Sequence, residues 1–211
     1  MRQLAQPLPS RPQRTRRSFT CASLKASSWT ATSQLLRQRG VKGVAAAEAA
    51  QLARWPRSYA LLDVRRADQF ALWHATGAVN TPLFRLIEVR DAWSLLRKLS
   101  FDAQAVDPVE EDPDFLEALT RATAGKRGVV FIDGEGGSLE TSSVRPNGTV
   151  SRSLLAAAAL LSQTPFAGAV LHLEYGLNAW FAEGLPGEGS GEGWVPSGRT
   201  ASAAQFAARQ R

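Results

Sequence analysis

The chain has 211 residues, with 25 Lys or Arg against 19 Asp or Glu, and its formal net charge is +6. With 44% hydrophobic residues and a single Cys, the composition excludes collagen-like, wholly disordered and disulfide-stapled chains, and the length suits one domain with tails. No apolar stretch of about 18 uninterrupted residues occurs, so we expect no transmembrane span.

The basic charge is concentrated at the N-terminus. Residues 1–47 contain nine basic side chains and no acidic one, because the first carboxylate is Glu48, and the remainder carries a net charge of −3. An acid-free segment rich in Arg, Ser and Thr is typical of a transit peptide. We therefore predict a leader over residues 1–40, plastid in preference to mitochondrial because of its Ser and Thr content. Cleavage between Cys21 and Arg39 would remove the only thiol.

The alternative for this segment is a basic arm that contacts nucleic acid. Its positive charges are spaced singly among Ser and Thr and do not form a dense block. This spacing favours the transit peptide, and we expect no nucleic-acid partner.

The rest of the chain alternates between helix-prone and strand-prone segments. In chain order, we predict a helix over Val44–Trp55, a strand over Ala60–Val64, helical turns over Arg66–His74, a strand over Ala78–Asn80, amphipathic helices over Phe84–Leu99 and Phe115–Thr123, a strand over Val129–Ile132, a helix over Ser151–Leu161, a strand over Ala169–Leu173 and a helix over Leu177–Glu183. This alternation predicts a single α/β domain with a mostly parallel sheet. The Gly- and Ser-rich stretch from Gly187 to Gly198 is predicted to be flexible, with residues 189–211 as the C-terminal tail.

Two separated motifs carry a resemblance to a known family. The first is Asp63-Val64-Arg65, Asp68-Gln69-Phe70 and His74-Ala75-Thr76-Gly77-Ala78-Val79-Asn80-Thr81-Pro82-Leu83; the second is Glu174-Tyr175-Gly176-Leu177-Asn178-Ala179-Trp180 with Gly184-Leu185-Pro186. In this order they resemble rhodanese-like domains, the sulfurtransferase family, over about residues 45–188, although Tyr175 stands where Gly is usual. Ser151-Arg152-Ser153 is similar to the end of the enlarged active loop in plant and algal plastid members. The resemblance implies a five-stranded parallel sheet between helices.

The resemblance also implies a nucleophilic cysteine, carrying a persulfide, at the start of the loop after the central strand. Aligning Gly136-Gly137-Ser138 with the Gly-Gly-Thr of plastid relatives puts Asp133 in that place, with Gly134 and Glu135 following it. A carboxylate cannot bear a persulfide sulfur, so we predict no thiosulfate sulfurtransferase activity. Because such loops bind anions through converging amides, we hypothesise that the Asp133 carboxylate accepts hydrogen bonds from them.

The other residues of the motifs are assigned supporting roles. Asp63 and Arg65 are interpreted as a structural pair beneath the loop, and His74, Gly77 and Trp180 as structural parts of the family pattern. Arg152 has two open interpretations, a cation that pairs with Asp133 or Glu135, and a solvent-facing side chain of the first helical turn.

Neither a metal site nor a cofactor is expected. The chain has only two histidines, His74 and His172, and they are far apart in sequence with no Cys partner. The acidic residues between Asp107 and Glu117 lack the spacing of an EF-hand and are interpreted as a solvated face.

These observations predict a non-catalytic interaction or regulatory module of the plastid, with a protein partner. One alternative is a domain that binds a sulfur-carrying partner without itself carrying sulfur. Another is a magnesium-dependent phosphohydrolase, because Asp133-Gly134-Glu135 after a strand resembles the Asp-x-Asp motif of the haloacid dehalogenase type, although the second acid is Glu and Gly137 holds the fifth position. The loop over residues 134–150 is predicted to be exposed enough to bind a partner or to be phosphorylated.

Overall fold

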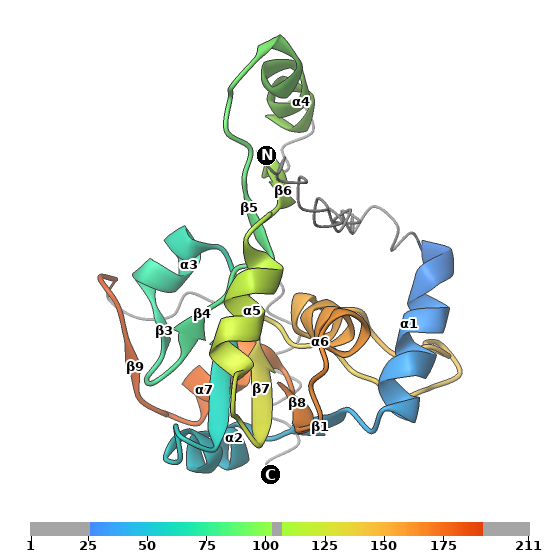
Figure 1. Ribbon diagram of the computed structural model, residues 1–211, viewed down its shortest axis with the longest axis vertical. Coiled ribbons are helices and arrows are strands. Elements are labelled where there is room, and N and C mark those ends of the chain that lie inside the picture. The colour runs from blue at the N-terminus through green and yellow to red at the C-terminus, as the bar shows by residue number, and fades with distance from the viewer. Residues whose placement is uncertain (1–25, 103–106, 192–211) are drawn as a thin grey trace, which may run out of the picture.

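The computed structural model describes residues 26–102 and 107–191 of the chain (Figure 1). Its helices are α1 (Ala26–Gln38), α2 (Ala46–Ala53), α3 (Ala67–Leu72), α4 (Ala92–Asp102), α5 (Phe115–Thr123), α6 (Arg152–Gln163) and α7 (Gly176–Ala182). Its strands are β1 (Lys42–Val44), β2 (Tyr59–Asp63), β3 (His74–Ala75), β4 (Val79–Asn80), β5 (Phe84–Leu86), β6 (Val109–Glu111), β7 (Gly128–Ile132), β8 (Ala169–Leu173) and β9 (Gly187–Glu188).

A five-stranded sheet forms the centre, in the order β1-β8-β7-β2-β4, and every neighbouring pair is parallel. β7 is the middle strand and all five of its residues are buried. Parallel sheets are covered on both faces, which is why their strands are continuous apolar runs. The predicted fold class, a mostly parallel five-stranded sheet flanked by helices, is confirmed.

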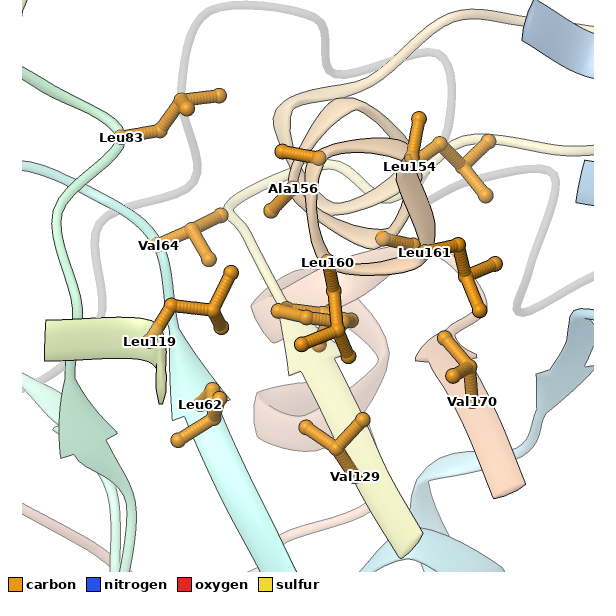
Figure 2. Close-up of a cluster of buried hydrophobic side chains, with 14 of the residues drawn as sticks. Leu62, Val64, Leu83, Leu119, Val129, Leu154, Ala156, Leu160, Leu161 and Val170 are labelled. Carbon is orange, nitrogen blue, oxygen red and sulfur yellow. The ribbon is translucent and has the colours of Figure 1, made fainter. Parts of the chain in front are cut away.

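Helices cover both faces of this sheet. Val129 and Phe131 of β7 pack with α1, α5 and α6, whereas Val130 and Ile132 pack with α2 and α7. Figure 2 shows the first of these clusters, with side chains of α6 such as Leu160 directed at β2, β7 and β8. Successive side chains of β7 point to opposite faces of the sheet, so this one strand contributes to the core on both faces.

The predicted helix over Phe84–Leu99 is wrong in its first half. Phe84–Leu86 is strand β5, which pairs antiparallel with β6 and is held by the cross-strand ion pair of Arg85 and Glu110 (3.0 Å). The helix α4 begins only at Ala92, because the Asp91 carboxylate caps it by accepting a hydrogen bond from the Ser94 N–H (2.7 Å). The acidic segment that was expected to be a plain solvated face thus contains a strand.

The folded unit begins earlier than the expected boundary at residue 45. Leu36 of α1 is completely buried, and Trp29 packs against the same cluster. The Arg39 guanidinium donates a hydrogen bond to the Leu161 carbonyl at the end of α6 (3.2 Å), and β1 is an edge strand of the central sheet. Residues 26–44, which we assigned to the leader and its junction, therefore include core structure, while residues 1–25, with Cys21, lie outside the described part.

The beginning of the expected flexible tail is also structured. Gly187–Glu188 forms β9, which pairs antiparallel with β3, and the Gly191 N–H donates to the Leu72 carbonyl (2.9 Å). The predicted tail beyond residue 191 lies outside the described residues. In the described ranges, none of the helices combines the length and apolar character needed to span a bilayer.

Candidate functional site

The carboxylate of Asp133 lies at the carboxyl end of the central strand and points into the loop that follows. Its Oδ1 accepts a hydrogen bond from the Gly136 N–H (2.6 Å), and its Oδ2 accepts one from the Ser153 N–H (2.9 Å). The residue is only 4% exposed. Each oxygen is thus held by a backbone amide, one from the loop and one from the first turn of α6, which is a site where an anion is favoured.

The start of α6 is arranged to support this contact. Ser151 caps the helix, its hydroxyl accepting a hydrogen bond from the Leu154 N–H (3.3 Å) and contacting the Ser153 hydroxyl (2.8 Å). The amides of the first helical turn have no partner within the helix and carry a partial positive charge. Ser153, fully buried, was not predicted as a site residue except through the Ser-Arg-Ser resemblance.

The backbone of the loop packs directly against the backbone of the first turn of α7. A Cβ on Gly136, whose φ is +65°, would lie 2.5 Å from the Gly176 nitrogen. The Asp133 and Gly134 carbonyls accept hydrogen bonds from the Leu177 and Asn178 N–H groups (2.9 and 3.2 Å). This contact requires glycine, because no side-chain atom fits between the two segments.

The remaining loop residues lie further out. Gly137 packs beside the capping Ser151, where a Cβ would approach the Ser151 hydroxyl to 2.6 Å. Ser138 forms an antiparallel bridge with Thr149, through hydrogen bonds of 3.0 and 2.7 Å between their backbones. Glu135 is exposed. Arg152 places its guanidinium over the Phe84 ring, 5.8 Å from the centroid, so its visible contact is a cation–π interaction and not an ion pair with Asp133.

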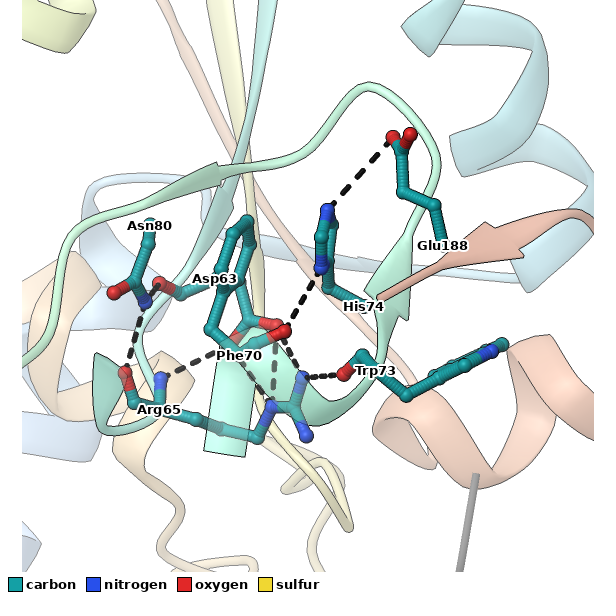
Figure 3. Close-up of polar contacts among 7 residues, drawn as sticks. All are labelled: Asp63, Arg65, Phe70, Trp73, His74, Asn80 and Glu188. Carbon is teal, nitrogen blue, oxygen red and sulfur yellow. Dashed lines mark hydrogen bonds and ion pairs between the residues drawn. The ribbon is translucent and has the colours of Figure 1, made fainter. Parts of the chain in front are cut away.

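Asp63 and Arg65 form a buried ion pair at the end of the neighbouring strand β2 (Figure 3). The Arg65 guanidinium contacts both carboxylate oxygens, at 3.0 and 2.7 Å, and also donates to the Trp73 carbonyl (2.6 Å). The Asn80 side chain donates to the carbonyls of Asp63 and Arg65 (3.0 and 2.9 Å). The pair thus joins β2, the end of α3 and β4 in one network.

The other motif residues are held by local contacts. His74 stacks on Phe70, with ring centroids 3.7 Å apart, and its Nδ1 lies 2.8 Å from the Phe70 carbonyl oxygen. Gly77, at φ +81°, donates to the Glu188 carboxylate (3.3 Å), and the buried Trp180 indole donates to the Pro186 carbonyl (2.9 Å). These contacts place the three residues in the packing around the sheet and not in the Asp133 loop.

Comparison with known proteins gives one relative that decides the family. The chain is 31% identical over 161 residues to rhodanese-like domain-containing protein 14, chloroplastic, of Arabidopsis thaliana, which covers 76% of this chain and 70% of the relative. The chain belongs to the rhodanese-like domain family. No family model matches it.

Two solved structures are similar to this rhodanese-like domain at lower sequence identity. The thiosulfate sulfurtransferase of Pseudomonas aeruginosa matches with a TM-score of 0.42 and 19% identity. The match covers 85% of this chain but only 27% of the length of that enzyme. The rhodanese-like domain from Anabaena also has a TM-score of 0.42, with 18% identity, and the match covers 74% of this chain and 85% of that domain.

His172 is a residue of this rhodanese-like domain that the sequence analysis did not connect with the site. It lies on β8, is completely buried, and has an Nδ1 atom with no hydrogen-bond partner among the described residues. Burial lowers its pKa from 6.5 to about 4, although the nearby Asp133 charge acts in the opposite direction. The ring is therefore neutral at physiological pH.

We expect acid to destabilise the domain through His172. Above pH 6.5 the ring is neutral in both states, whereas between pH 6.5 and about 4 only the unfolded chain takes up the proton. As the pH is lowered from 6.5 to about 4, protonation of His172 in the unfolded chain should therefore reduce the free energy of unfolding by up to about 3 kcal/mol. Urea unfolding at pH 7 and pH 4.5 measures this loss of stability, which should be smaller for His172→Leu than for the parent. His74→Gln is the control, and it should lose as much stability between the two pH values as the parent does. An equal loss in parent and His172→Leu would contradict the assignment.

The described ranges contain no group of three or more His, Cys, Asp or Glu side chains placed to hold a metal ion.

Proposed function

We propose that this rhodanese-like domain is a non-catalytic module of the plastid that acts by binding a protein partner. In this proposal Asp133 stands in the place of the family's nucleophilic cysteine. The observation that carries it is the pair of hydrogen bonds from the Gly136 and Ser153 amides to the Asp133 carboxylate. The amides that would stabilise a cysteine thiolate and an incoming anion are thereby occupied by a side chain of the domain itself.

The chemistry of the family explains why this replacement removes activity. A thiolate attacks the outer sulfur of thiosulfate, forms a persulfide and releases sulfite, and cyanide then takes the sulfur as thiocyanate. A carboxylate offers no polarisable sulfur for the first step. The chain's single cysteine, Cys21, lies in the N-terminal segment that we propose to be removed.

A plastid location is supported by two observations. The N-terminal segment is rich in Arg, Ser and Thr and free of acidic residues. The Arabidopsis relative is named as a chloroplastic protein. Nothing comparable supports the mitochondrial alternative, so we propose that residues 1–25 belong to a plastid transit peptide.

The test is a thiosulfate-to-cyanide sulfurtransferase assay on the full-length chain carrying Cys21→Ser. We expect no activity with Asp133 in place and a gain of activity with Asp133→Cys, because the thiolate would take up the amides that now hold the carboxylate. Ser138→Cys is the matched control, since it adds a thiol to the same loop away from these amides. Circular dichroism should show that all three proteins are folded.

Three results would contradict the proposal. Activity of the Cys21→Ser protein with Asp133 intact would show that the reaction does not need a cysteine there. Equal activity of Asp133→Cys and Ser138→Cys would remove the special position of Asp133. Magnesium-dependent hydrolysis of a phosphate ester that is abolished by Asp133→Asn would require the phosphohydrolase alternative.

A further inference from the structure

The amino edge of the central sheet carries an exposed tryptophan. In a parallel sheet, the segments that lead into the strands lie at one edge, and the segments that follow the strands lie at the opposite edge. Trp55 belongs to the segment that leads into β2 and is 68% exposed. Figure 1 shows α2, which ends two residues before Trp55, at the end of the molecule opposite α4. A single exposed apolar side chain needs no explanation by itself, so its neighbours decide what it can contact.

The segment before β2 is joined to the segment before β7. The Arg127 N–H donates a hydrogen bond to the Ser58 carbonyl (2.8 Å), and the Lys126 ammonium donates one to the Pro56 carbonyl. These contacts bring four cations to the edge that carries Trp55. The cations are Arg54, Arg57, Lys126 and Arg127, and together with Trp55 we call them the basic edge.

The cations of the basic edge have no counter-charge. None of the four forms an ion pair with a described residue, and residues 49–62 and 118–132 contain neither Asp nor Glu. By contrast, all six arginines from Arg65 to Arg121 are ion-paired. The dipole of α2 favours a cation at its C-cap, Arg54, but it gives no reason for an exposed indole beside it. The basic edge is therefore an uncompensated positive surface, although residues 48–211 carry a net charge of −3.

We propose that the basic edge docks on an anionic lipid bilayer. The indole of Trp55 suits the boundary between head groups and acyl chains, and the long cationic side chains reach the head groups. The backbone here is already engaged, since the Ser58 and Tyr59 N–H groups donate to the Trp55 carbonyl (2.8 and 2.9 Å). Side chains alone thus meet the ligand, which favours a surface recognised by charge and apolar depth.

Docking in this way leaves the Asp133 loop accessible. Asp133 follows β7, whereas Arg127 precedes it, so the two lie at opposite edges of the same sheet. A domain bound through the basic edge therefore turns the Asp133 loop away from the bilayer. The inference concerns a separate surface and does not depend on the proposed function.

Nucleic acid is the competing polyanion, and the residues of the basic edge disfavour it. Proteins that bind single strands stack successive bases on several aromatic side chains along a groove. The segments over residues 54–58 and 124–127 contain one aromatic residue, Trp55. Base edges are read by side chains such as Asn, Gln, Ser and Thr. The only one of these in the two segments is Ser58, which is half-buried.

The proposal is tested by flotation of the full-length chain with lipid vesicles. We expect binding to vesicles of phosphatidylglycerol and phosphatidylcholine, none to phosphatidylcholine alone, and release by salt. Arg57→Ala should weaken binding about fivefold, the factor that one Lys or Arg contributes near an anionic surface, and Trp55→Ala by at least as much. Arg90→Ala and Trp93→Ala are the matched controls, because both side chains are exposed at the opposite end of the molecule and should not affect binding. Residues 1–25 are unchanged in every variant, so their charge contributes equally.

A polarity-sensitive fluorophore locates the contact. In the Cys21→Ser chain, the label on Trp55→Cys should shift its emission to shorter wavelength on anionic vesicles, whereas the same label on Trp93→Cys should not. Circular dichroism should show that all variants are folded.

Three results would overturn the proposal. The first is a full-length chain that does not float with anionic vesicles. The second is flotation that Trp93→Ala weakens as much as Trp55→Ala does. The third is equal flotation of Arg57→Ala and Arg90→Ala, and if Arg57→Ala then weakens binding of a single-stranded oligothymidine, the basic edge is assigned to nucleic acid.

Discussion

Replacing Arg65 with Ala is expected to lower the free energy of unfolding by about 3–5 kcal/mol, because the completely buried Asp63 carboxylate then loses its counter-charge. The loss includes the hydrogen bonds from the guanidinium to both carboxylate oxygens and to the Trp73 carbonyl. Water cannot replace them without opening the contact between β2 and α3. Urea unfolding at neutral pH measures the effect.

Two further variants separate the buried charge from a general effect of losing an arginine. Arg121→Ala removes an exposed i,i+4 pair with Glu117 (2.8 Å) and should cost well under about 1 kcal/mol. The double variant Asp63→Leu with Arg65→Met removes both charges and should be more stable than Arg65→Ala alone. Equal stability of Arg65→Ala and Arg121→Ala would show that the buried ion pair of Figure 3 does not stabilise the domain more than an exposed one.

Gly176→Ala should also destabilise the domain strongly, by about 2–5 kcal/mol, because two costs add. Its φ of +58° is left-handed, which costs an L-residue about 1–2 kcal/mol. Its Cβ would also lie 2.4 Å from the Asp133 carbonyl oxygen and 2.6 Å from the Gly136 nitrogen, so the loop must move at a further cost of about 1–3 kcal/mol.

Gly184→Ala carries only the first cost, so the difference between the two variants measures the second. Gly184 has a φ of +65°, but a Cβ there would meet no atom within 4 Å, so only the conformational cost remains. Thermal or urea unfolding should therefore rank Gly176→Ala well below Gly184→Ala. Placed in the Asp133→Cys chain, Gly176→Ala should also abolish the gained sulfur transfer. Equal stability of the two glycine variants would show that the loop yields freely to the added methyl group.

The central fold could be predicted from the sequence, because its strands are compact apolar runs. Ala60–Val64, Val129–Ile132 and Ala169–Leu173 each fall on a strand of the sheet, within one residue at their ends. β1 was missed because three residues containing Lys and Gly show no apolar run, and the partner β8 determines their conformation. β5 was missed because the spacing of Phe84 and Leu86 fits both a strand and the helical pattern that continues to Leu99.

The contacts of the candidate site could be predicted only in part. The position of Asp133 at the end of the strand could be predicted from the resemblance, and so could a role for its carboxylate as an anion. The identity of the donors could not, because the Ser153 amide is brought close by the packing of α6 across β7 and is 20 residues away in sequence. The sequence likewise offers no sign that the Trp73 carbonyl lies beside Arg65.

The packing of α1 limits where the transit peptide that we propose could be cleaved. Leu36 is completely buried, and Trp29 packs on the same cluster. A protease that cut near Arg39 would remove a buried leucine, a loss that costs about 2–5 kcal/mol when the side chain alone is deleted, and would uncover α6. We therefore expect cleavage of the proposed transit peptide to give a stable product only when it falls before Trp29, so that α1 stays in place over the domain.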